Sequence, residues 1–209
     1  GRIRVMRTDG PGGRDVVTVP GHYTRPSFSP DGGWLVYRST GPDNIRGYTH
    51  AERPGIHVAS VAGGEPGKVR DDAEEPRFDH TGERIYFSDA RNEKAVLASV
   101  NLLGGDEIVH LQSANATQIV PSPDGRWVAF SERHRTYIGA FPRSGRAIDI
   151  GPDVDAFPVS RVSTNAGMSL HWSGDDRLHW VLGPDYFTRE AGEIGEPEAR
   201  GVAIGFTAR

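Results

Sequence analysis

The sequence contains no cysteine, so neither a disulfide framework nor a cysteine-ligated metal site can stabilise this chain. It also lacks a run of about 18 apolar residues, the length that a membrane-spanning helix needs. The formal net charge of −4 does not provide the basic surface by which proteins bind nucleic acid. The 209 residues are enough to bury a core without covalent help. We therefore expect a globular protein without a membrane span and without a nucleic-acid partner.

What the sequence does contain is a recurring turn followed by an apolar strand. In the copy Arg25–Arg38, a Ser-Pro-Asp-Gly turn precedes the apolar run Trp34–Tyr37. Proline suits the second position of a type I turn, aspartate bonds its own backbone, and glycine accepts a positive φ. An apolar run of this kind is typical of a strand covered on both faces. Related copies follow at Pro76–Phe87, Ile119–Phe130 and Leu170–Val181.

A second series of turns alternates with the first. These turns lie at Gly13, Gly64, Gly105 and Gly145. Two hairpins in each repeat of about 40–50 residues are typical of propeller blades with four strands each. The sequence thus predicts an all-β fold, a β-propeller of four-stranded blades.

Three blades are predicted to be complete and two to be half-blades. The complete blades span about His22–Arg70, Asp71–Ser113 and Ala114–Pro158. An outer hairpin precedes them, and Arg161–Leu182 supplies only an inner hairpin. Residues 1–183 are then the propeller, and 184–209 are a linker or closing strand leading to a further domain downstream. Pairing of the two half-blades would give a four-bladed propeller; otherwise the chain is part of a larger one, with open blade edges that favour a partner chain or a homo-oligomer.

These repeats resemble the TolB-like family of propeller repeats. Segments that carry a closer resemblance are Gly63–Pro66, Glu75–Phe78, Pro121–Phe130, His171–Ser173 and Gly201–Phe206. They are similar to the propeller region of large bacterial amidohydrolases, in which the propeller precedes a metal-dependent hydrolase barrel. The resemblance implies an exported, periplasmic protein and a hydrolase domain as partner.

The active site of that family is not recognisable in this sequence. Its metals are bound by a His-x-His pair with further histidines and an aspartate, and none of the eight histidines here forms such a pair. His171 and His179 flank one turn without an accompanying acidic cluster, whereas a metal site needs three or four converging ligands. The segment Gly167–His171 also fails as a serine nucleophile elbow, because its last position is not glycine. We therefore predict no catalytic residue, no metal and no cofactor in this segment, and place any hydrolase chemistry after Arg209.

Two places remain as candidate binding sites. The innermost strand of each blade lines the central channel, and repeat alignment places Arg25, Glu75, Gln118 and Ser169 at one mouth, with Ser27, Arg77, Val120 and His171 two positions deeper. Of these, Arg25, Glu75, Arg77, Gln118 and His171 are the candidate ligand-binding residues, for a polar ligand, a peptide terminus or an ion; the alternative is that any propeller channel is polar. The second place is the long loop between Gly41 and Pro54, where Tyr48 and His50 suit a partner contact, although simple disorder would also explain the loop.

Aromatic residues need no ligand to explain them. The tryptophans fall at equivalent or adjacent strand positions, which predicts packing between blades for Trp34, Trp127, Trp172 and Trp180. The sequence therefore favours a non-catalytic propeller module that acts as a scaffold or gate for a downstream amidohydrolase. The alternative is a stand-alone propeller of the bacterial envelope that binds proteins or peptides.

Overall fold

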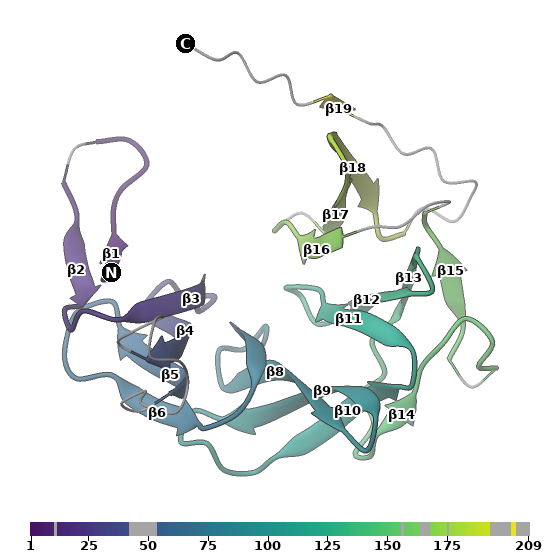
Figure 1. The fold of residues 1–209 in the computed structure, drawn as a ribbon, viewed down its shortest axis with the longest axis horizontal. Helices are drawn as coiled ribbons and strands as arrows, with labels where there is room; N and C mark the ends of the chain where they lie inside the picture. The colour runs from purple at the N-terminus through teal and green to yellow at the C-terminus, as the bar shows by residue number, and fades with distance from the viewer. Residues whose placement is uncertain are drawn as a thin grey trace. The chain divides into compact units, whose positions relative to one another are not determined.

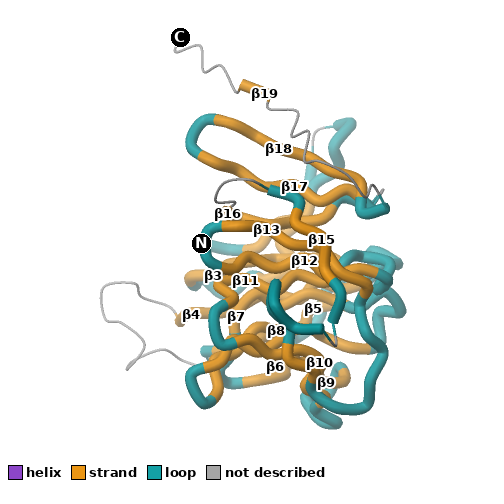
Figure 2. Tube along the Cα trace, turned by 90° about the vertical axis from the view of Figure 1, so that its right-hand side faces the viewer, coloured by secondary structure: helices purple, strands orange, loops and turns teal. Residues whose placement is uncertain are grey.

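The computed structural model describes residues 1–10, 12–41, 54–155, 157–163, 168–174, 176–192 and 202–203, which form strands joined by turns and loops (Figures 1 and 2). No helix occurs in these ranges, so none of their residues belongs to a helix that could cross a membrane. The chain divides into two compact units, Gly1–Asp89 with Ala98–Ile108 and Ala90–Leu97 with Val109–Arg209.

The strands form one hairpin and four larger sheets (Figure 1). The hairpin pairs β1 (Ile3–Val5) with β2 (Arg14–Val17). The first sheet has the order β3 (His22–Phe28), β4 (Trp34–Gly41), β5 (Gly55–Ser60) and β6 (Gly67–Arg70). The second sheet contains β7 (Glu74–Phe78), β8 (Arg84–Arg91), β9 (Lys94–Asn101) and β10 (Ile108–Ser113), with β14 (Ile148–Asp149) added beside β10.

The remaining sheets have four strands each. The third has the order β11 (Ala116–Pro121), β12 (Trp127–Glu132), β13 (Arg135–Ala140) and β15 (Val159–Arg161). The fourth has the order β16 (Met168–Trp172), β17 (Arg177–Leu182), β18 (Asp185–Glu190) and β19 (Val202–Ala203). The all-β class is confirmed, as are the four-stranded blades, with β14 as a fifth strand on the second sheet.

The last sheet corrects the sequence prediction. Residues after Pro184 were expected to be linker, yet Asp185–Glu190 is a strand that pairs along β17. Leu182 pairs with Asp185, so Gly183 and Pro184 form a two-residue hairpin turn, and Gly183 has the positive φ of 58° that such turns require. The sequence prediction ended the propeller at Gly183, but Gly183 and Pro184 are the centre of a hairpin.

The third sheet departs from the prediction at its outer edge. The turn around Gly145 was expected to return the chain along β13, but β15 (Val159–Arg161) makes that pairing instead. The intervening β14 pairs in parallel with β10, where Lys94 Nζ lies 2.6 Å from Asp149 Oδ1 and Ile150 N donates to Gln112 O at 2.9 Å. The Lys94 ammonium group also holds the pKa of the Asp149 carboxyl below its usual value.

The Ser-Pro-Asp-Gly turn is closed by a side-chain pair. Ser29 Oγ donates to Asp31 Oδ1 at 2.5 Å and accepts from Trp34 N at 2.9 Å, and Gly33 N donates to Asp31 Oδ1 at 3.0 Å. The Ser29 hydroxyl, more than the Gly33 amide, lowers the pKa of Asp31. The same set of bonds recurs at Ser122–Trp127. Each turn thus satisfies the amides at the start of the strand that follows.

The turn of the second sheet reverses the two side chains. Asp79 takes the place of the serine and Thr81 the place of the aspartate: Thr81 Oγ1 donates to Asp79 Oδ2 at 2.7 Å. Arg84 N donates to Asp79 Oδ1 at 3.0 Å and Glu83 N to Thr81 Oγ1 at 3.2 Å. The backbone amides at the equivalent positions of both turns are therefore bonded. The turn requires a hydroxyl paired with a carboxylate, in either order along the chain.

We expect the exchange Asp79→Ser with Thr81→Asp to restore stability that the single changes lose. Thr81→Asp alone sets a second carboxylate against the buried Asp79 and should cost about 1–3 kcal/mol of unfolding free energy. Asp79→Ser alone removes the acceptor for Thr81. In the double variant the arrangement of Ser29 and Asp31 is rebuilt, so its stability should lie within about 1 kcal/mol of the original. Urea unfolding of the four proteins measures this coupling, and a double variant no more stable than Thr81→Asp would contradict it.

The core consists of residues packed between neighbouring sheets of the same unit. In the first unit, the β1–β2 hairpin packs on the first sheet through a cluster of Val16, Val17, Leu35, Tyr37 and Ala59. In the second unit, a cluster joins the third and fourth sheets through Val120, Ala129, Ile138, Val162, Leu170, Leu178 and Trp180. Trp127 and Trp172 pack against this cluster while partly buried. Packing between blades is therefore confirmed for three tryptophans, but Trp34, at the start of β4 beside an exposed turn, is 44% exposed.

Candidate binding site

The residues that the repeat alignment placed at the start of the innermost strands share an unusual backbone. Arg25, Glu75 and Ser169 have φ values of 54°, 52° and 57°, in the left-handed region. Each lies at a register shift in the pairing of its strand with the next. Gln118 also follows such a shift but is not among the positive-φ residues. A left-handed conformation costs a non-glycine residue about 1–2 kcal/mol, so three equivalent cases indicate a feature that the fold maintains.

Ser169→Gly tests this strain. Glycine adopts the left-handed region without a steric penalty, so the substitution should raise the free energy of unfolding by about 1 kcal/mol. The matched control is Ser27→Gly on β3, which is not in the left-handed region; there glycine should lower stability by about 0.5–1 kcal/mol. Thermal and urea unfolding measure both changes, and effects of the same sign would contradict the strain.

In the first unit, three of the predicted site residues come together. Glu75 lies between two guanidinium groups: its Oε1 is 2.8 Å from Arg25 Nη2, and its Oε2 is 3.7 Å from Arg77 Nη2. The Arg25 side chain is 59% exposed, whereas those of Glu75 and Arg77 are 23% and 24% exposed. The cluster Arg25–Glu75–Arg77 therefore has one solvent-facing arginine and one arginine that lies deeper.

The positive charge of Arg77 is only partly neutralised within this cluster. Burial is the main effect that lowers the pKa of its guanidinium, the positive charge of Arg25 lowers that pKa further, and the Glu75 carboxylate opposes both. At 3.7 Å the carboxylate is beyond hydrogen-bond distance. Within the described part of the chain, the Arg77 side chain donates no hydrogen bond. A partly exposed guanidinium with open donors can bind a further acceptor.

A second ion pair beside β7 was missed from the sequence. Arg38 Nη2 lies 2.8 Å from Glu74 Oε1, and Arg38 Nε donates to Ala73 O at 3.0 Å. In the sequence, Arg38 directly follows the apolar run of β4, and Glu74 directly precedes Glu75. A positive charge on one strand and a negative charge on the next were therefore the signal that could have predicted this ion pair. The pair ties β4 to the start of β7 and so supports the backbone that carries Glu75.

In the second unit, Gln118 serves the packing of neighbouring strands. Its Oε1 accepts a hydrogen bond from Leu170 N at 3.0 Å, and two residues deeper Val120 O accepts one from Trp172 Nε1 at 3.0 Å. Both bonds join β11 to β16. Gln118 was predicted as a ligand-binding residue, and its side-chain oxygen already accepts a hydrogen bond within the fold.

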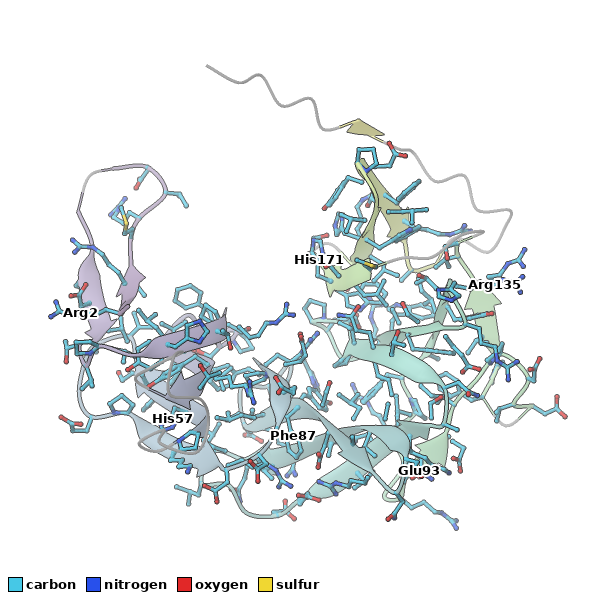
Figure 3. All side chains as sticks on the ribbon, viewed as in Figure 1. Arg2, His57, Phe87, Glu93, Arg135 and His171 are labelled. Atoms are coloured by element: carbon cyan, nitrogen blue, oxygen red, sulfur yellow. The ribbon has the colours of Figure 1, made fainter. Side chains whose placement is uncertain are left out.

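His171, labelled in Figure 3, lies on β16 of the fourth sheet and belongs to a row of stacked rings. Its ring stacks on His179 with centroids 5.0 Å apart, and His179 stacks on Tyr186 at 5.4 Å. His171 Nδ1 lies 3.1 Å from Ser169 O, a carbonyl that only accepts, so this nitrogen carries the proton. His179 Nε2 lies 2.7 Å from Ser173 Oγ. Tyr186 was not predicted because it lies in the segment taken as linker.

The other candidates yield less. Across the described ranges, no three histidine, aspartate or glutamate side chains are grouped as metal ligands would be. Tyr48 and His50, predicted as a partner contact, lie outside the residues that the structure describes.

Solved structures with this arrangement of sheets are numerous. TolB from Acinetobacter baumannii has a TM-score of 0.64 at 16% identity, covering 90% of this chain and 46% of that one. A nidogen/laminin complex gives a TM-score of 0.59 at 14% identity, covering 91% and 69%. The chain is a β-propeller. The β-propeller domain of the trilobed protease from Pyrococcus furiosus also matches, with a TM-score of 0.54 at 16% identity, covering 91% and 60%.

These similarities establish the fold of the propeller and its likeness to TolB. No family model and no curated protein matches the sequence. The propeller spans between 46% and 69% of the length of the three matched chains.

Proposed function

We propose that this propeller is a non-catalytic module that serves as a scaffold or gate for a metal-dependent amidohydrolase domain encoded downstream. The observation that carries the proposal is the environment of Glu75, the only carboxylate among the aligned inner-strand residues. It lies between the guanidinium groups of Arg25 and Arg77, an arrangement suited to binding. The resemblance of the repeats to amidohydrolase propellers supports the nature of the domain. The trilobed protease supplies a parallel, since its propeller is a domain of a hydrolytic enzyme.

A second candidate is a stand-alone propeller that binds proteins or peptides in the bacterial envelope. The cluster Arg25–Glu75–Arg77 favours it, because charged side chains with open donors suit a polar ligand. The chain shares the propeller fold of TolB, and the proposed binding role uses that fold. In both cases we propose an exported, periplasmic protein.

The coding frame around this chain separates the two candidates. A scaffold or gate predicts a downstream His-x-His segment followed by about 200–250 residues of alternating strands and helices. A stop codon soon after Arg209 would overturn that role and leave the binding propeller.

A hydrolysis assay tests the shared claim that the module is non-catalytic. The purified chain, supplied with Zn²⁺ or Mn²⁺ and amide or ester substrates, should give no turnover above the buffer blank. Turnover that Glu75→Gln abolishes would overturn both candidates, because it would make Glu75 an acid or base.

A further inference from the structure

The cluster Arg25–Glu75–Arg77 carries one positive charge more than its internal carboxylate neutralises. Glu75 approaches Arg25 at 2.8 Å and reaches Arg77 only at 3.7 Å. The deeper guanidinium thus keeps its donors, and it is the group whose pKa burial and Arg25 both lower. A second carboxylate would remove that surplus charge and fill the donors.

Two residues of this cluster have a strained backbone conformation. Arg25 and Glu75 each lie at a bulge and have backbone angles in the left-handed region. Residues with such strained backbone angles are often found at ligand sites. The Arg38–Glu74 ion pair, at 2.8 Å, braces the residue next to Glu75. Arg25 is placed by its own bulge, and Arg77 directly follows the bulge at Glu75, so both guanidinium groups already lie beside the Glu75 carboxylate. Less freedom is lost when a planar anion binds groups that are placed in advance.

We propose that Arg25 and Arg77 bind the carboxylate of a monoanionic ligand, and that Glu75 occupies part of that site when the ligand is absent. This inference rests on the binding role proposed above and adds the ligand class. Guanidinium groups match carboxylates through paired N–H donors. One surplus positive charge suits a monoanion, whereas a phosphate dianion would overcompensate the cluster and be repelled by Glu75. The carboxylate belongs to a peptide C-terminus or to a sugar acid, two sources of the same chemistry.

Titration of the chain with small carboxylates tests the proposal. The probes are N-acetyl-glycyl-glycine, its C-terminal amide, glucuronate and inorganic phosphate, each followed by calorimetry and by NMR of the arginine side chains. We expect at least one carboxylate to bind at least ten-fold more tightly than the amide and more tightly than phosphate. Binding should weaken with added salt, because the attraction is between charges.

Variants locate the site. Arg77→Met should weaken carboxylate binding at least ten-fold, and Arg25→Gln, at a largely exposed side chain, provides the same test without a threat to folding. Arg7→Ala removes an exposed guanidinium that pairs with Asp9, so it is the control for loss of one charge and should leave binding unchanged. Glu75→Gln should tighten binding several-fold, because it removes the internal competitor.

The outcomes separate the ligand class from the binding role. Carboxylate binding lost in Arg77→Met and Arg25→Gln and strengthened in Glu75→Gln supports the proposal, and the better of the two carboxylates identifies the source. Equal binding of the peptide acid and its amide, or tighter phosphate binding, overturns the ligand class and leaves the binding role. Weaker binding in Glu75→Gln would show that Glu75 only orders the arginines and would also overturn the proposal. No binding of any probe overturns the site and removes the support for the second candidate function.

Discussion

Trp180→Ala should lower the free energy of unfolding by about 3–5 kcal/mol, the usual cost of removing a buried aromatic side chain. Trp180 is 2% exposed and belongs to the cluster that joins the third and fourth sheets. Its ring also stacks on Phe187, with centroids 5.7 Å apart and planes inclined by 11°. The substitution removes contacts to both sheets at once and leaves a cavity in the cluster that joins them. Urea unfolding followed by circular dichroism measures the loss.

Trp34→Ala is the matched control for this experiment. The Trp34 side chain is 44% exposed, and its contribution to the turn comes from backbone atoms that alanine retains. We expect a loss of about 1 kcal/mol or less. Similar losses at Trp34 and Trp180 would mean that packing between the third and fourth sheets is not what stabilises the second unit.

Gly55→Ala should destabilise the first sheet by about 3 kcal/mol or more, because steric overlap adds to backbone strain. A Cβ atom at position 55 would lie 2.0 Å from Arg70 O and 2.6 Å from Asp71 O. Both obstacles are backbone carbonyls, which cannot rotate away as a side chain would. Gly55 also has a φ of 122°, a region that residues with a side chain rarely adopt. Thermal unfolding and soluble yield measure the effect.

Gly63→Ala separates strain from overlap. Gly63 has a similar φ of 104°, but no atom lies within 4 Å of the Cβ that alanine would add. Only backbone strain remains, so the expected loss is about 1–2 kcal/mol. If the two variants lose the same stability, strain explains both and the overlap at Gly55 is relieved by movement of β6.

The fold was predictable wherever hydrogen bonding is local. The Ser-Pro-Asp-Gly turn satisfies its own amides within six residues, so the copies at Ser29 and Ser122 mark the strands on both sides. The Asp79–Thr81 copy kept this property in reverse order, and strand spacing still identified it. The prediction failed at β14, because the partner of Ile148 is Leu111 of the preceding repeat, and no local pattern specifies a pairing so distant.

The site was predictable only in part. Repeat alignment identified Arg25, Glu75 and Arg77 as residues of the innermost strands, and the structure brings them together. Alignment gives a position and not its partners, so it could not show that Gln118 is engaged by the backbone of Leu170. The left-handed backbone at Arg25 and Glu75 also could not be predicted, because neither arginine nor glutamate is typical of a bulge.

The parallel strand β14 has a consequence for how the propeller unfolds. It is contributed by the chain between β13 and β15 of the third sheet, yet its hydrogen bonds lie along β10 of the second. Repeats that touch only through side chains can fray one at a time from an end. Here the third repeat cannot detach without uncovering the backbone amides of β10, so these two repeats should exchange their amide hydrogens as one cooperative unit. The shared strand also covers the edge of β10 at Leu111 and Gln112, which shortens the edge on which a second molecule could start to aggregate.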